Sequence, residues 1–112
     1  MSDTQEARTR KLAAQNLIPE FESIIRICRG LVNTPPGNPT IPNLVGRVDQ
    51  IIHKCAAVVH IITMGATPPR RALAGSWRTF TDEWNKTPKR IGIAATVLDH
   101  SLNELKQIAE GG

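Results

Sequence analysis

The chain has 112 residues, of which 40% are hydrophobic, 21% are charged and 4% are aromatic, with no Tyr and a formal net charge of +4. This composition excludes a disordered chain and suits one folded domain with an aliphatic core. No apolar run approaches the ~20 residues of a membrane span, and the polar N-terminus lacks the apolar centre of a signal peptide, so we expect an intracellular, cytoplasmic protein with no membrane partner.

The first helix is predicted over residues 16–32. Apolar residues recur there at three- and four-residue spacing and define one buried stripe: Leu17, Phe21, Ile24, Cys28 and Leu31. Pro is tolerated only near a helix start or at a kink. We therefore expect the helix either to begin near Asn16 or to be broken or kinked near Pro19. Residues 1–15 are then a polar N-terminal arm, helical or frayed, and residues 16–112 form the domain.

The second helix, over residues 41–64, has the widest apolar arc of the chain. Thr40 as N-cap, with Pro42 in the first turn, predicts its start, and Gly65 predicts its end. An arc this wide is typical of a helix that contacts two neighbours rather than one. It consists of Ile41, Leu44, Val45, Val48, Ile51, Ile52, Cys55, Val58, Val59 and Ile62.

Two further helices are predicted, each after a Thr-Pro pair. The pair at Thr67 predicts a helix over residues 68–85, and the pair at Thr87 predicts another over residues 88–110. The apolar stripes are Leu73, Trp77, Phe80 and Trp84 in the former and Ile91, Ala94, Ala95, Leu98, Leu102, Leu105 and Ile108 in the latter. Because short connections make sequential helices antiparallel, we predict an all-α fold, a small antiparallel four-helix bundle.

The surplus of positive charge lies in residues 67–90, which carry six basic and two acidic side chains. Cations interleaved with aromatic rings are typical of nucleic-acid binders, and Trp and Arg also dominate protein–protein interfaces. The same aromatic residues have the spacing of a core stripe, so a buried stripe with a solvated basic rim is the third interpretation. The candidate partner-binding residues are Arg70, Arg71, Trp77, Arg78, Trp84, Lys86, Lys89 and Arg90.

Patterns for catalysis or metal binding are weak. Asp49 and His53 are four residues apart, and His60 lies two turns further on, which suits an acid–base pair or half a metal site. No second cluster completes it, and zinc, phosphate-loop and nucleophile-elbow patterns are missing. Cys28 and Cys55 fall on apolar faces, which indicates small core residues in a reducing compartment. We expect no enzyme, no metal and no cofactor.

The wide arc of the second helix and the missing catalytic groups favour a non-enzymatic protein-interaction or assembly module. It would act as an adaptor or regulatory subunit that binds another protein or itself, as a homo-dimer or larger oligomer. The alternative is a small basic nucleic-acid-associated protein of viral, phage or plasmid type that uses residues 67–90. The third hypothesis is a helical enzyme or metal protein built around His53 and His60.

Overall fold

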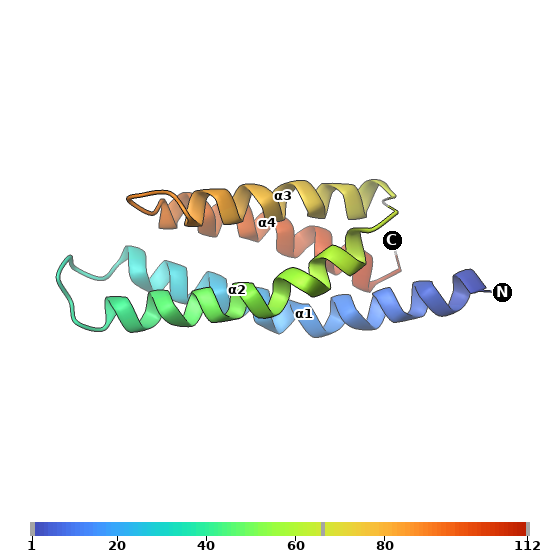
Figure 1. The fold of residues 1–112 in the computed structure, drawn as a ribbon, viewed down its shortest axis with the longest axis horizontal. Helices are drawn as coiled ribbons and strands as arrows, with labels where there is room; N and C mark the ends of the chain where they lie inside the picture. Colours follow the sequence, from blue (N-terminus) through green and yellow to red (C-terminus); the bar gives the residue numbers. More distant parts are fainter. Residues whose placement is uncertain (1, 66, 112) are drawn as a thin grey trace.

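The computed structural model describes residues 2–65 and 67–111, with side chains from Gln5 onward. The chain forms α1 (Ser2–Val32), α2 (Ile41–Thr63), α3 (Pro68–Trp84) and α4 (Ile91–Ala109). Each helix runs antiparallel to the one before it (Figure 1). The prediction of an all-α four-helix bundle is confirmed. Within the described ranges, no helix combines the length and the apolarity that a bilayer crossing requires.

The four helices form a closed ring of neighbours. Helix α4 packs extensively against both α1 and α3, whereas α2 has the least extensive contacts, with α1 and more weakly with α3. The bundle is elongated, measuring 56 × 19 × 18 Å, and the first turns of α1 project beyond the other helices (Figure 1). Helix α2 is therefore the least covered member of the bundle.

Helix α1 begins well before residue 16, where the stripe from Leu17 to Leu31 placed the start of the predicted helix. It continues through Pro19 without a break, and residues 3–15 belong to the same helix rather than to a separate turn. The segment before Pro19 has its own packing, because Ala14 is fully buried and Gln15 donates a 3.4 Å hydrogen bond from Nε2 to the carbonyl oxygen of Ala109. This packing offsets the one backbone hydrogen bond that a proline removes.

The core consists of the predicted stripes. All five predicted residues of α1, all four of α3 and all of α4 except the half-buried Ile91 are buried. Helix α2 differs, because only Val48, Cys55, Val59 and Ile62 are buried there. The other predicted residues of its arc are only half-buried, namely Ile41, Leu44, Val45, Ile51, Ile52 and Val58.

Two of the three helix starts predicted from a capping Thr and a nearby Pro are correct. Helices α2 and α3 begin directly after Thr40 and Thr67, although neither hydroxyl makes the predicted capping hydrogen bond. The predicted start of α4 at Pro88 is wrong by about one turn, since α4 begins at Ile91. The connection instead folds back on α3, where the backbone N–H of Arg90 donates to the carbonyl oxygen of Glu83 at 3.2 Å.

Candidate functional site

The aromatic residues of the 67–90 segment lie in the core. Phe80 and Trp84 are at most 1% exposed, and Trp77 is buried as well. Phe21 of α1 stacks on Trp77, with ring centroids 5.2 Å apart. In the folded chain Trp77 and Trp84 therefore present no ring face to a base or a protein partner. Their burial corresponds to the third interpretation of this segment, a core stripe.

Trp84 is held by polar groups from two other parts of the chain. Its indole Nε1 donates a 2.7 Å hydrogen bond to Oδ1 of Asp49 on α2. Nζ of Lys89 lies 4.6 Å from the ring centroid and donates to the Trp84 carbonyl oxygen at 3.0 Å. A buried indole N–H needs an acceptor, and a cation is attracted to an aromatic face. Asp49 and Lys89 thus hold Trp84 in place.

Arg70 is also structural, with only 8% of its surface exposed. Its guanidinium donates to the carbonyl oxygens of Met64 and Gly65, at 2.9 and 3.2 Å, and to the Thr67 hydroxyl at 3.1 Å. Those carbonyls follow the end of α2, where a cation is favoured by the helix dipole. Gly65 permits the turn with a φ of 64°. Arg70 therefore joins the end of α2 to the start of α3.

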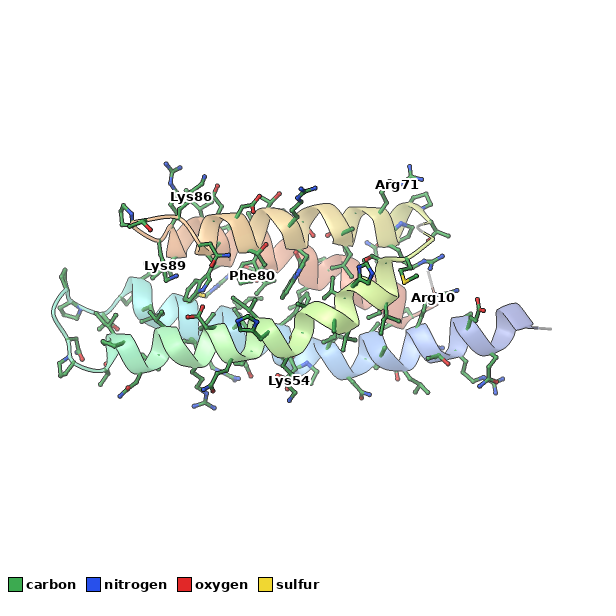
Figure 2. All side chains as sticks on the ribbon, viewed as in Figure 1. Arg10, Lys54, Arg71, Phe80, Lys86 and Lys89 are labelled. Carbon is green, nitrogen blue, oxygen red and sulfur yellow. The ribbon has the colours of Figure 1, made fainter. Side chains whose placement is uncertain are left out.

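The remaining predicted cations lie on the outward side of α3 and in the following loop. Arg71, Arg78, Lys86 and Arg90 are exposed, and Arg71 and Lys86 point away from the bundle (Figure 2). Glu83 accepts a 2.6 Å hydrogen bond from Lys86, and its other carboxylate oxygen lies 3.9 Å from Nε of Arg90. The charge of the loop is thus partly compensated. Arg71 and Arg78 have no ion pair with any described residue.

The Asp49, His53 and His60 set does not come together as a site. Asp49 is half-buried and bonded to Trp84, whereas both histidines are exposed on the solvent side of α2. In the part of the chain that the structure covers, no group of three or more His, Cys, Asp or Glu side chains is arranged to hold a metal. Asp49, His53 and His60 lie on the same helix, as predicted, but the Asp49 carboxylate faces α3, where it bonds to Trp84.

Both cysteines are free and buried, which confirms their predicted place in the core. Burial raises the pKa of the Cys28 thiol to about 11. Burial, with a smaller contribution from the nearby Glu20 carboxylate, raises the pKa of Cys55 to about 12. Both thiols are therefore protonated at neutral pH and are poor nucleophiles and poor metal ligands.

A polar link between α3 and α4 was missed from the sequence. Ser101 is fully buried and donates a 2.7 Å hydrogen bond to the Ser76 hydroxyl, which in turn donates to Oε1 of Glu104. A signal was present, because Ser101 interrupts the apolar stripe of α4 between Leu98 and Leu105. Because Ser101 is fully buried, these linked hydrogen bonds fix α3 and α4 against each other.

An apolar groove runs along the seam between α1 and α2, and we call it the α1–α2 groove. Two hollows follow one another in register along the antiparallel helices. The first is lined by Gln5, Glu6, Thr9, Arg10, Ile61, Met64 and Gly65, and the second by Ala13, Asn16, Leu17, Glu20, Lys54 and Val58. Ile61 and Met64, at 56% and 59%, are the most exposed large hydrophobic side chains that the structure describes.

No protein-family model matches this chain, and neither does any curated protein or solved structure. The fold defines the class of protein, an all-α bundle of four helices. Many unrelated functions share folds of this class, so function has to be inferred from particular surfaces and residues.

Proposed function

We propose that this chain is a non-enzymatic helical assembly module, and that the α1–α2 groove binds a second copy of the chain. The supporting observation is the incomplete cover of α2. Most of its apolar arc is only half-buried, and Ile61 and Met64 extend the apolar surface into solvent. Ile61, Met64 and the half-buried Val58 line the groove, and exposed apolar side chains beside a groove are typical of an interaction site.

The charges beside the groove suit pairing between identical copies. One end carries Glu6 and Arg10, and the other carries Glu20 and Lys54, which form a 3.4 Å ion pair. A two-fold axis across the groove brings one end against the opposite end of the second copy. Each end then offers one acid and one base to its counterpart, so the pairing is complementary in charge.

Lysine substitution in the groove is expected to prevent self-association. The double variant Ile61→Lys with Met64→Lys removes two exposed apolar side chains, whose burial contributes roughly 1 kcal/mol each, and adds two like charges to both sides of the interface. Sedimentation equilibrium should show self-association weakened by more than about tenfold, which corresponds to 1.4 kcal/mol. Helicity should be unchanged.

The matched control is Leu12→Lys. Leu12 is an α1 side chain with 55% exposure, close to that of Ile61, but it does not line the groove. This variant should associate as the unmodified chain does. A strictly monomeric unmodified chain at high concentration, or equal weakening in both variants, would contradict pairing through the groove.

Nucleic-acid binding is the second candidate, favoured by the distribution of charge. Five acidic side chains are half-buried and bonded within the protein, namely Glu20, Asp49, Glu83, Asp99 and Glu104. Glu20, Glu83 and Asp99 each pair with a cation, whereas Asp49 and Glu104 bond to neutral donors. The cations outside these pairs, among them Arg71 and Arg78, therefore give the surface its basic character. Because Trp77 and Trp84 are buried, binding would rely on contacts to phosphates alone.

This candidate predicts salt-dependent binding through Arg71, Arg78, Lys86 and Arg90. Four phosphate contacts give a slope of about −3 to −4 in a plot of log affinity against log salt concentration. The measurement is fluorescence anisotropy of labelled single-stranded RNA and duplex DNA at about 50 and 200 mM salt. Changing the four residues to Glu should abolish binding, whereas Arg47→Glu, on the exposed side of α2, should not. Absence of binding at the lower salt concentration would remove this candidate.

A further inference from the structure

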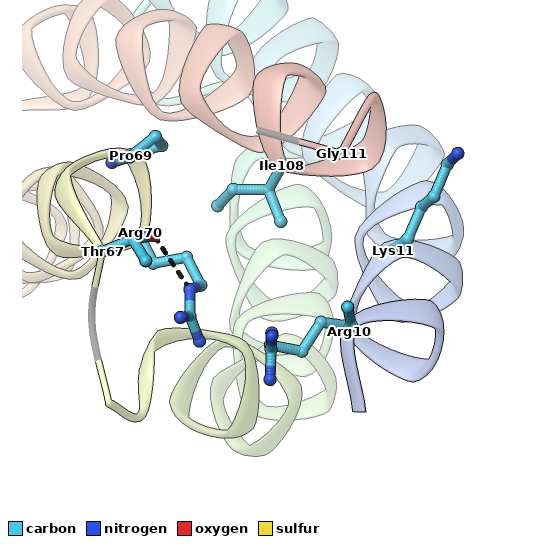
Figure 3. A pocket seen from close by; sticks show the side chains of 8 residues that line it. Arg10, Lys11, Thr67, Pro69, Arg70, Ile108 and Gly111 are labelled. Carbon is cyan, nitrogen blue, oxygen red and sulfur yellow. Dashed lines mark hydrogen bonds between the residues drawn. The ribbon is translucent and has the colours of Figure 1, made fainter. Parts of the chain in front are cut away.

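One end of the bundle contains a cleft that none of the four exposed cations Arg71, Arg78, Lys86 and Arg90 lines. It lies between the first half of α1, the start of α3 and the end of α4 (Figure 3). Its volume is about 280 Å³, and its lining residues are Ala7, Arg10, Lys11, Thr67, Pro69, Arg70, Ile108 and Gly111. Three of these eight residues are cationic and none is acidic.

Arg70 is a fixed donor at this cleft. Its guanidinium carries five N–H groups, and three of them are bonded to Met64, Gly65 and Thr67. Two N–H groups remain without an acceptor among the described residues. Because the side chain is more than nine-tenths buried and held at three points, it meets a ligand with little loss of conformational entropy.

Arg10 supplies charge that the protein does not compensate. This half-buried side chain makes no hydrogen bond or ion pair within residues 5–65 and 67–111. Its guanidinium points toward that of Arg70, whereas the Lys11 amine points away from the cleft (Figure 3). Glu6, one turn before Arg10, lines the neighbouring groove and is the acid closest to Arg10 along α1. Two guanidinium groups on one cleft repel each other, and an anion between them relieves that repulsion.

We propose that this cleft binds a phosphate monoester, with its oxyanion between Arg10 and Arg70 and its organic group against Ile108 and Pro69. The planar guanidinium fork matches phosphate geometry, which is why Arg recurs in phosphate sites. Ile108 and Pro69 provide an apolar wall beside the two cations. Arg10 lines both this cleft and the α1–α2 groove, so the site borders the surface proposed for pairing, and its test measures phosphate binding rather than self-association.

The test is calorimetric titration with phenyl phosphate and with inorganic phosphate at constant ionic strength. Arg10→Gln should weaken the binding of both by about tenfold, as expected for the loss of one charge-assisted contact. The matched control is Arg8→Gln, since Arg8 is an exposed cation two residues away that does not line the cleft. That variant should bind within about twofold of the unmodified chain.

Glu6→Gln gives a second test that does not depend on removing Arg10. It removes the negative charge closest to Arg10 along α1, so the potential at the cleft becomes more positive and binding of phenyl phosphate should become tighter. Unchanged or weaker binding in this variant, equal affinities of Arg10→Gln and the unmodified chain, or no saturable binding at millimolar phosphate would overturn the site. Phenyl phosphate should bind more tightly than inorganic phosphate. Equal or tighter binding of the inorganic ion would overturn the assignment to a monoester.

Discussion

Replacing Trp84 with alanine is expected to lower the free energy of unfolding by about 3–5 kcal/mol, the usual cost of truncating a buried aromatic side chain. The indole is 1% exposed, so its removal leaves a cavity between the helices. The change also deprives Asp49 of its donor and Lys89 of the ring that it covers. Urea denaturation followed by circular dichroism measures the loss.

Trp84→Phe separates the hydrogen bond from the packing. It keeps most of the apolar volume but leaves Asp49 without its donor, and we expect a loss of about 1–3 kcal/mol. Adding Asp49→Ala to this variant should cost less than the same change costs in the unmodified chain, because the two groups interact directly. Additive losses, or a loss below about 1 kcal/mol for Trp84→Ala, would contradict the central position of Trp84 in the core.

Replacing Arg70 with methionine is expected to lower the free energy of unfolding by about 2–3 kcal/mol. Methionine keeps the length and apolar contacts of the side chain but loses all three hydrogen bonds. The carbonyl oxygens of Met64 and Gly65 then lose their donor. Hydrogen exchange should therefore become faster in the last turn of α2, in addition to the change seen in denaturation.

The control for this prediction is Arg71→Met. Arg71 is the next residue along α3, but it is exposed and has no ion pair with the described residues. Its replacement should change the stability by less than about 0.5 kcal/mol. Equal losses for the two variants would show that the loss of a positive charge near the start of α3, rather than the loss of the contacts of Arg70, determines the effect.

The sequence was sufficient to predict the four helices and most of the core. Apolar residues repeat with the period of the helix, and Pro and Gly interrupt the pattern where helices begin and end, so the information is local. The stripe of Leu73, Trp77, Phe80 and Trp84 is buried as its spacing requires. Helix α4 begins later than the Thr87–Pro88 pair predicts, because the residues after this pair bond to the carbonyl oxygens of Trp84 and Glu83 instead of starting the helix.

The tertiary structure alone decided which polar residues have structural roles and which remain on the surface. Asp49 and Trp84 are 35 residues apart in the chain, and Ser76 and Ser101 are 25 apart, so no local pattern pairs them. Arg70 and Arg71 are adjacent and chemically identical, yet one is buried against α2 and the other is exposed. The cleft beside Arg10 and Arg70 arises in the same way. The reason is that helix periodicity fixes which residues share a face, whereas the contacts of a face depend on how the helices pack against one another.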